Sequence, residues 1–252
     1  MDMSIDYSEK LAAMREGGLI LNEAIRKAAD SILPGISTEE LNAIAEDCIR
    51  QAGALPAFLG YKGYPKSACI SINDEVVHGI PSDKRLIKNG DVVGIDLGVK
   101  YKGFYTDKAV TAGVGKIPDN ALKLIDVTRR ALEIGLEVCR NWQGRKISDI
   151  SRAIQEYVEE NKFSIVRDLS GHGIGKELHE DPRVPNFTSK KFPEVDLYEG
   201  VTLAIEPMVI AGDWKVKTLS DGWTIVSADG SPAAHFEDTI ILTDKGCEIL
   251  TR

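Results

Sequence analysis

The chain has 252 residues, of which 43% are hydrophobic and 28% are charged, a composition typical of a globular protein. Its formal net charge of −8, with no run of Lys or Arg, argues against nucleic-acid binding. Residues 1–18 lack an apolar segment and predict neither a signal peptide nor a membrane anchor. Because the four cysteines are too widely spaced for CxxC pairs, we expect a reducing, cytoplasmic location.

Two helix pairs are expected along the chain. Residues 8–32 carry apolar side chains at helical spacing up to the breaker "LPG", and residues 37–53 open with a capping box between Ser37 and Glu40. The same order returns at residues 118–140 and 147–163, as a long amphipathic helix followed by a shorter one. The chain therefore repeats a helix–helix unit.

The segments between the helices repeat as well. "VHGIP" (77–81) resembles "GHGIG" (171–175), "LIKNGDVVGIDLGV" (86–99) resembles "LYEGVTLAIEPMV" (197–209), and "YTDKAVT" (105–111) resembles "HFEDTIIL" (235–242). Three matches in the same order indicate an internal duplication, with halves of roughly 1–115 and 116–252 in a single domain over 1–252. The predicted fold is α/β (α+β), with one curved, mostly antiparallel sheet covered by two helix pairs.

Four acidic residues occupy matched positions in these apolar strands: Asp96, Asp107, Glu206 and Glu237. We expect them to converge near the pseudo-two-fold axis. A buried carboxylate without a partner costs several kcal/mol, and no basic residue except Lys108 stands nearby. Acids that point out of the sheet, or that pair with Lys or Arg, are the alternatives. Four carboxylates balance two divalent cations, so the pattern predicts a two-metal site for Mn, Fe, Co or Zn.

The histidines complete this interpretation. In "SGHGIGKELHEDP", the glycines beside His172 let the backbone pass close to the site, and His172 is interpreted as a metal ligand. His179 is interpreted as a group near the metals or facing the substrate, and His78 is expected opposite His172. His235 stands two residues before Glu237 and is expected on the same strand face. It either forms a hydrogen bond near the site or is an ordinary core histidine.

The motifs "VHGIP", "GIDLGVKYKGFYTD", "GHGIGKELHEDP", "AIEPM" and "AHFEDT", in this order, resemble those of type I methionine aminopeptidases of the bacterial kind. The resemblance spans essentially the whole chain and implies the pita-bread fold. It implies that two metal ions are held by Asp96, Asp107, His172, Glu206 and Glu237. It further implies that His78 and His179 touch the substrate, and that a methionine pocket is formed by Tyr61, Tyr64, Cys69 and Trp223.

The resemblance also implies the activity. The enzyme would remove the N-terminal methionine of peptides and nascent chains near the ribosome, prefer a small second residue, and act as a monomer. Glu206 would move a proton, while His179 and His78 would contact the reacting amide. The spacing of Glu206 and Glu237 leaves no room for the insertion of type II enzymes, and no zinc-binding extension is expected before the first helix. The alternatives are an X-Pro aminopeptidase or prolidase, or a non-catalytic peptide-binding module.

Overall fold

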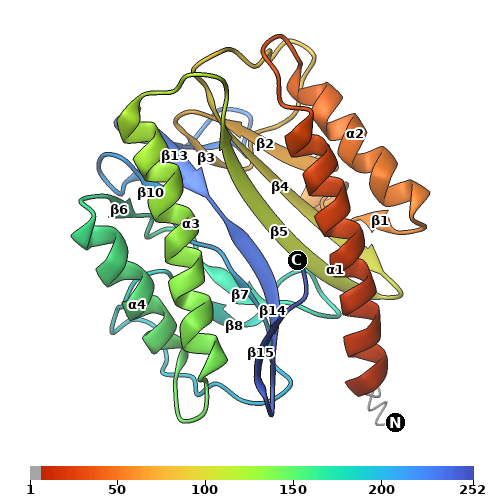
Figure 1. The fold of residues 1–252 in the computed structure, drawn as a ribbon, viewed down its shortest axis with the longest axis vertical. Coiled ribbons are helices and arrows are strands. Elements are labelled where there is room, and N and C mark those ends of the chain that lie inside the picture. Colours follow the sequence, from red (N-terminus) through yellow and green to blue (C-terminus); the bar gives the residue numbers. More distant parts are fainter. Residues whose placement is uncertain (1–6) are drawn as a thin grey trace.

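The computed structural model describes residues 7–252 (Figure 1). Residues 1–6 lie outside the described residues. They are the first part of segment 1–18, for which neither a signal peptide nor a membrane anchor is predicted. Within 7–252, the α-helices are α1 (Tyr7–Asp30), α2 (Thr38–Gln51), α3 (Asp119–Arg140) and α4 (Ile147–Glu160), and a short 3-10 turn, η1, spans Tyr61–Gly63. No helix in this part of the chain is long and apolar enough to cross a membrane.

The four helices form where the sequence predicts them. The capping box that opens α2 is present: Ser37 Oγ accepts a hydrogen bond from the Glu40 backbone N–H at 3.1 Å, and the Glu40 carboxylate accepts one from the Ser37 N–H at 2.8 Å. The last helix ends at Glu160, three residues earlier than predicted. Lys162 then adopts a φ of 68°, a left-handed conformation that a helix cannot continue.

One large antiparallel sheet organises the molecule, in the order β1-β4-β5-β14-β9-β7-β8, with β2 paired to β4 and β15 to β14. The strands of this sheet are β1 (Leu55–Pro56), β2 (Ala68–Ile72), β4 (Val92–Tyr101), β5 (Phe104–Gly113), β7 (Gly171–Gly173), β8 (Glu180–Val184), β9 (Thr202–Ile205), β14 (Glu237–Thr243) and β15 (Gly246–Ile249). Two small sheets are added: β13 (Ala233–His235), β10 (Met208–Ile210) and β6 (Ser164–Ile165), and β11 (Val216–Thr218), β12 (Ile225–Ser227) and β3 (Glu75–Val77).

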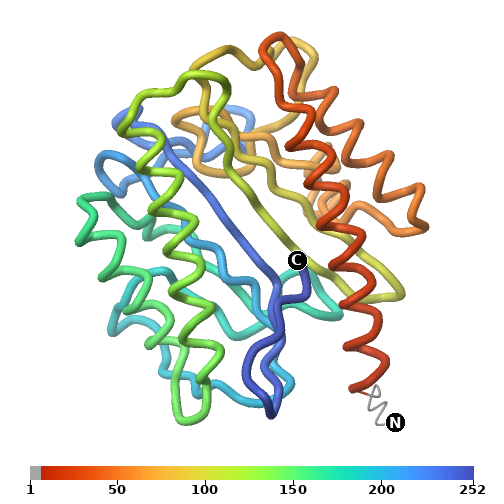
Figure 2. The backbone as a smooth tube through the Cα atoms, viewed as in Figure 1, coloured from red at the N-terminus to blue at the C-terminus, as the bar shows by residue number. Residues whose placement is uncertain are grey.

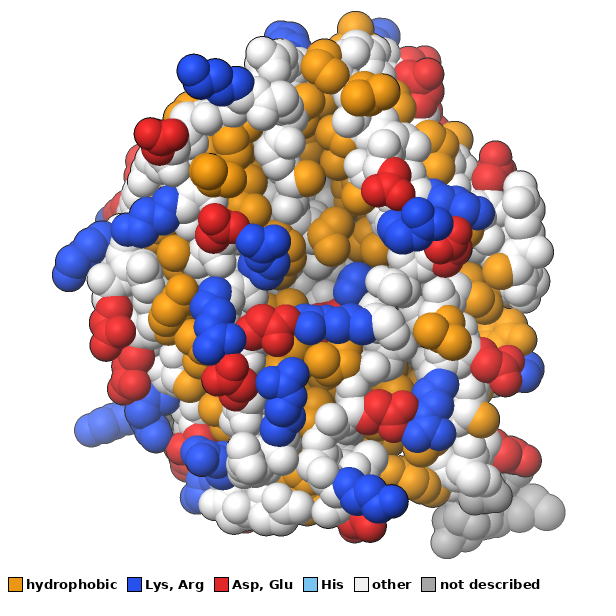
Figure 3. All heavy atoms as spheres, viewed as in Figure 1, with side chains coloured by type: hydrophobic (Ala, Val, Ile, Leu, Met, Phe, Trp, Pro, Cys, Tyr) orange, Lys and Arg blue, Asp and Glu red, His pale blue; other side chains and the backbone are white. Residues whose placement is uncertain are grey.

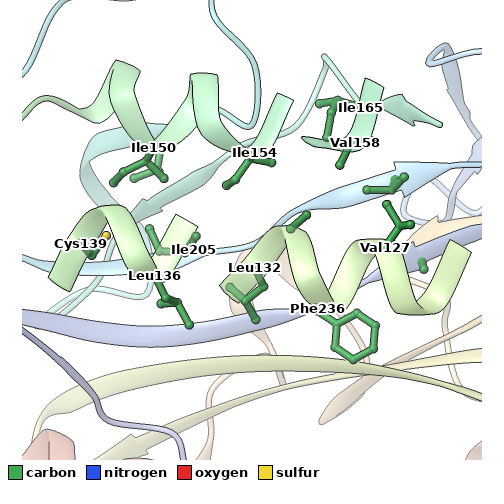
Figure 4. Packing of buried hydrophobic residues seen from close by; sticks show 14 of the residues in the cluster. Val127, Leu132, Leu136, Cys139, Ile150, Ile154, Val158, Ile165, Ile205 and Phe236 are labelled. Carbon is green, nitrogen blue, oxygen red and sulfur yellow. The ribbon is translucent and has the colours of Figure 1, made fainter. Parts of the chain in front are cut away.

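The helices cover one face of the large sheet in two pairs (Figures 1 and 2). Beneath α3 and α4, the side chains of Leu136, Ile150, Ile154 and Ile205 are fully buried against one another (Figure 4). A second cluster, which includes Leu21, Leu41, Ile95 and Leu97, lies beneath α1 and α2. The predicted antiparallel sheet with two helix pairs on its outer face is confirmed.

The two parts of the sheet meet where β5 lies beside β14. Regular pairing there covers two positions, Ala109 with Glu237 and Lys108 with Asp238. We call this contact the seam. The C-terminal end of the chain lies over it, between α1 and α3 (Figures 1 and 2). On the same face, the space-filling view shows hydrophobic side chains within a hollow between the helix pairs, with acidic and basic side chains interspersed around it (Figure 3).

Candidate metal centre and active-site cavity

The acidic residues of β4 and β5 face away from the helices because side chains alternate along a strand. Ile95 and Leu97 of β4 are buried in the core under α1 and α2, so Asp96 between them points to the opposite face. On that face lies a cavity of about 580 Å³. Every residue predicted for the site lines it: Tyr61, Tyr64, Cys69, His78, Asp96, Asp107, His172, His179, Glu206, Trp223 and Glu237. The larger cavity beside α4, about 960 Å³, contains none of them.

The four acids reach the cavity from different strands. Asp96 lies on β4 and Asp107 on β5, and the register that pairs Asp96 with Ala109 places the two acids close together on one face. Glu237 is the first residue of β14 and pairs with the same Ala109. Glu206 directly follows β9. The sheet therefore brings together carboxylates that are far apart in the sequence.

Ligand-type atoms cluster around Glu237. Asp107, His172 and Glu237 offer one atom each within 4.8 Å of one another, and Glu206, His235 and Glu237 do the same. His172 Nε2 lies 3.6 Å from Glu206 Oε1, which links the two groups. Glu237 belongs to both groups and is therefore positioned between two adjoining ligand sets.

Burial dominates the electrostatics of these acids. It raises the pKa of Asp96 to about 7 and that of Glu206 to about 7, in the latter against the opposing effect of His172. The pKa values of Asp107 and Glu237 lie well above the usual range, first through burial and then through the negative charge of neighbouring carboxylates. Charge accumulated in this way requires protons or cations to compensate it.

The unpartnered atoms test whether metal ions fit here. Among residues 7–252, Asp96 Oδ1, Glu237 Oε1 and His235 Nε2 are buried without a hydrogen-bond partner. Buried polar atoms are normally satisfied, and those left over need a partner such as an ion. Carboxylate and imidazole donors that converge on one cavity suit divalent transition metals. The residues present therefore fit a metal centre.

The ring of His172 is oriented for coordination. Its Nδ1 lies 2.8 Å from the carbonyl oxygen of Gly173. Because a carbonyl can only accept, Nδ1 donates this hydrogen bond, and Nε2 is the ring nitrogen that faces the carboxylates. This orientation by a hydrogen bond on the other nitrogen is typical of metal-binding histidines.

His179 and His78 flank the carboxylates. The His179 ring lies 4.2 Å from the His172 ring between centroids, and its Nδ1 is 2.9 Å from the Tyr61 hydroxyl. Burial lowers the pKa of His179 to about 3 and that of His78 to about 4, so both rings are neutral at pH 7. The "VHGIP" segment is not a strand throughout: β3 ends at Val77, and His78 adopts a φ of 61°. The two copies of this motif thus differ in backbone conformation.

The residues predicted for a methionine pocket form one wall of the cavity. The Tyr64 ring meets Trp223 edge-on, with centroids 5.1 Å apart, and its hydroxyl donates a hydrogen bond to Ala68 O at 3.0 Å. Its polar end is thus directed at the backbone rather than at a ligand. Cys69 is buried, and burial raises the pKa of its thiol well above the usual range. This wall is aromatic and neutral.

His235 differs from the expectation of a shared strand with Glu237. It ends β13 and pairs with Met208, whereas Glu237 begins β14 in the large sheet. The expectation of one common strand face is therefore wrong, because Phe236 separates two strands. His235 Nε2 nevertheless lies 3.5 Å from Glu206 Oε2 and 3.8 Å from Glu237 Oε2. His235 thus lines the cavity, but its Nε2 has no hydrogen-bond partner among the described residues, so neither the hydrogen bond near the site nor the satisfied core histidine is found.

A curled antiparallel sheet with buried carboxylates and histidines at its centre defines a metal-dependent hydrolase of the pita-bread fold. Residues 12–244 match Metallopeptidase family M24, and the chain belongs to this family. It is 48% identical to methionine aminopeptidase 1 of Bacillus subtilis over 96% of each chain. It is 42% identical to methionine aminopeptidase of Escherichia coli, over 100% of this chain and 94% of that one.

Solved structures agree with this assignment. The crystal structure of methionine aminopeptidase from Thermotoga maritima superposes with a TM-score of 0.94 at 41% identity, over 100% of both chains. Prolidase from Pyrococcus furiosus has a TM-score of 0.77 at 24% identity, and the match covers 97% of this chain and 64% of that one. The prolidase likeness concerns the fold alone.

Proposed function

We propose that this protein is a methionine aminopeptidase that removes the N-terminal methionine from peptides and nascent proteins and prefers a small second residue. The observation that carries the proposal is the convergence of four carboxylates and His172 on one cavity beside an aromatic pocket; Asp107 and Glu237 are buried, and Asp96 and Glu206 are partly buried. Relatives of this activity at 42–48% identity over nearly the full length support it. An X-Pro aminopeptidase is not favoured, since such structures share the fold at 22% identity and are matched over 61% of their length.

Asp96, Asp107, His172, Glu206 and Glu237 would hold two divalent ions, with Asp107 and Glu237 shared between them. When bound, such ions polarise carbonyl groups and acidify water. The identity of the ions, among Co, Mn, Fe and Zn, and their number belong to this proposal. Its support is the donor set itself, because carboxylates and imidazole are the donors that these metals accept.

Glu206 is the residue that we propose moves a proton in the reaction. In the metal-free protein burial raises the pKa of its carboxyl to about 7, and its position in the cavity beside His172 places it where a water molecule and the substrate amide would meet. Its backbone carbonyl accepts a hydrogen bond from Asn186 Nδ2 at 2.9 Å, which fixes the strand end that carries it. Glu206 would thus take a proton from water and return it to the leaving amine.

His179 and His78 would handle the substrate amide. If the Tyr61 hydroxyl donates its proton to His179 Nδ1, the ring proton of His179 sits on Nε2, where it can donate to an oxygen that becomes negative in the transition state. His78, which lines the same cavity near Trp223, would contact the nitrogen of the same amide. Both rings remain neutral near pH 7 because of their burial.

The methionine side chain would lie against Tyr61, Tyr64, Cys69 and Trp223. A thioether is soft and polarizable and makes favourable contacts with aromatic rings. The thiol of Cys69 stays protonated at pH 7 because burial raises its pKa. The wall is thus uncharged, as a pocket for an apolar side chain requires.

The test is hydrolysis of Met-Ala-Ser compared with Ala-Pro-Ala. We expect cleavage of the first peptide by protein loaded with Mn, Fe, Co or Zn, and loss of cleavage when a chelator is added. Preferential cleavage of Ala-Pro-Ala would instead support an X-Pro peptidase. Metal binding without cleavage of either peptide would support a non-catalytic peptide-binding module.

The setting of the enzyme is proposed on the same grounds. We infer a single domain over 1–252, with the halves 1–115 and 116–252, that works as a monomer in the cytoplasm on chains leaving the ribosome. A net charge of −8 supports the absence of nucleic acid among its partners. Sedimentation of the purified protein tests the oligomeric state, and a dimer would contradict this part of the proposal.

A further inference from the structure

Two threonine hydroxyls, that of Thr239 in the seam and that of Thr111 beside it, take the place of direct backbone hydrogen bonds. The antiparallel register of β5 and β14 places Asp107 opposite Thr239. There the backbone N–H of Asp107 donates to Thr239 Oγ1 at 2.8 Å, and the same hydroxyl donates to the carbonyl oxygen of Asp107 at 2.8 Å. Beside the seam, where β5 passes the end of β13, Thr111 Oγ1 accepts from the N–H of His235 at 3.0 Å and donates to its carbonyl oxygen at 2.7 Å.

These hydroxyls matter because of the residues that they hold. A regular antiparallel ladder joins opposite residues by direct N–H to C=O bonds. A threonine hydroxyl on the neighbouring strand can take the place of these bonds, because it accepts from the N–H and donates to the C=O of one residue. Thr239 does this at Asp107, and Thr111 does it at His235, both of which line the cavity.

The C-terminal residues Leu250–Arg252, which we call the wedge, explain why the backbone of Thr239 does not pair with that of Asp107 directly. The backbone of Thr239 is already engaged: its carbonyl accepts from the Leu250 N–H at 2.9 Å, and its N–H donates to Thr251 Oγ1 at 3.2 Å. Helix α1 packs closely against this wedge at Gly18. A side chain there has no room, because an added Cβ would lie 1.9 Å from the Leu250 carbonyl oxygen. The segment Leu250–Arg252 therefore separates β14 from β5 at this point.

An ion-pair network secures the wedge beneath the metal centre. Asp238, the residue after Glu237, is 1% exposed and accepts hydrogen bonds from Lys108 Nζ at 2.6 Å, Thr251 Oγ1 at 2.8 Å and Arg252 Nε at 2.8 Å. In the chain, Asp107 is directly followed by Lys108 and Glu237 by Asp238, and Lys108 and Asp238 form an ion pair in this network.

We propose that Thr239 is a positioning residue for the metal centre: its hydroxyl, with the wedge of Leu250–Arg252 beside it, sets the separation of Asp107 and Glu237. The proposal rests on the assignment of these two acids as shared metal ligands. Its reason is geometric, because the backbone of Asp107 is tied to a side chain only two residues from Glu237 on β14. Partners of this kind, which hold metal ligands without touching the metal, commonly account for 10–100-fold in metal affinity.

The experiment is a titration of the metal-free protein with Co²⁺, followed by visible absorption and by competition for binding. Thr239→Val keeps the shape of the side chain but removes the hydroxyl, and we expect Co²⁺ affinity to fall about 10–100-fold with an altered absorption spectrum. Thr239→Ser restores the hydroxyl and should restore both properties. Thr128→Val is the matched control, because Thr128 is fully buried in α3 and donates to Leu124 O at 2.8 Å, outside the cavity.

Three results would overturn the proposal. These are an unchanged affinity and spectrum in Thr239→Val, an equal loss in Thr128→Val, or no recovery in Thr239→Ser. If Thr239→Val does not fold, Thr251→Val is used instead, since it frees the N–H of Thr239; an affinity equal to that of the native protein would then count against the proposal. A native protein that binds Co²⁺ but does not cleave Met-Ala-Ser would remove the proposed function and leave the role of Thr239 standing.

Discussion

The two faces of the large sheet have opposite physical character. On the helix-covered face, Ile95 and Leu97 of β4 are fully buried among apolar side chains. On the other face, Asp96 from the same strand is partly buried, and its Oδ1 atom is fully buried without a hydrogen-bond partner among the described residues. The first face stabilises the fold through burial of apolar area. The second face is destabilising as long as its charges are uncompensated. Adjacent residues on β4 therefore have different roles: Ile95 and Leu97 stabilise the fold, and Asp96 belongs to the site. Substitutions on one face should change stability, and substitutions on the other face should change activity.

The largest effect is expected on the cavity face, from Glu206→Gln. This change keeps the size and an oxygen donor but removes the group proposed to move a proton, so turnover of Met-Ala-Ser should fall about 10²–10⁴-fold. The stability of the metal-free protein should not fall, because an ionisable group whose burial is unfavourable is replaced by a neutral one. Steady-state kinetics and thermal unfolding measure the two effects. Near-normal turnover would remove Glu206 from the chemistry.

A core substitution on the helix face should do the opposite. Ile154 of α4 is fully buried against Leu136 and Ile205 (Figure 4). Ile154→Ala should lower the free energy of unfolding by about 2–5 kcal/mol through lost burial and the cavity left behind. Activity per folded molecule, measured well below the unfolding temperature, should stay close to that of the native protein. A large loss of activity in the folded variant would show that the two faces are coupled.

Metal removal should make stability depend on pH. Burial raises the folded-state pKa of Asp96 and Glu206 to about 7, above the unfolded values near 4. Between these values the folded, metal-free protein binds more protons than the unfolded chain, so its stability falls as pH rises from about 4 to 7 and levels off for these two groups above that.

Thermal unfolding in chelator between pH 5 and 8 measures this slope. Protein loaded with divalent metal, whose carboxylates are ionised and compensated, should show a much flatter dependence. Equal slopes with and without metal would mean that these carboxyls are not the groups that titrate on folding.

The smallest effect is expected at an exposed ion pair on the helix side. Arg15 of α1 contacts Glu248 of β15 at 2.6 Å, and half of the Arg15 side chain is exposed. Arg15→Ala should change the free energy of unfolding by no more than about 1 kcal/mol, since water and salt screen such pairs. Chemical denaturation tests this value. A change of several kcal/mol would show that the contact between α1 and β15 is far more important than its exposure suggests.

Helical periodicity, the capping box at Ser37 and the repeated motifs were sufficient to predict the four helices and the antiparallel sheet. Those signals are local or depend on order along the chain. The acidic residues of the cavity could be named because acids in apolar strands are conspicuous: an unpaired Asp96 within "VVGIDLGV" needs an explanation. The residues of the aromatic wall were named only through the family resemblance.

The arrangement at the seam could not be predicted in this way. That Thr239 bonds to Asp107 depends on the register of β14 against β5 and on the wedge formed by Leu250. His235 and Glu237 lie on two strands because β13 pairs with β10, whereas β14 pairs with β5 and β9. A threonine or histidine in an apolar strand has many satisfactory environments, so its sequence position alone carries little information. Contacts between residues more than a hundred positions apart decide these details.

The most direct measurement is calorimetric titration of the metal-free protein with Co²⁺ in two buffers of different ionisation enthalpy. We expect saturable binding with release of protons near pH 7, abolished or strongly weakened in Asp107→Asn and Glu237→Gln. Binding should be retained in Arg15→Ala. Absence of saturable binding, or binding that these two substitutions leave unchanged, would contradict the claim that the buried carboxylates form a metal centre.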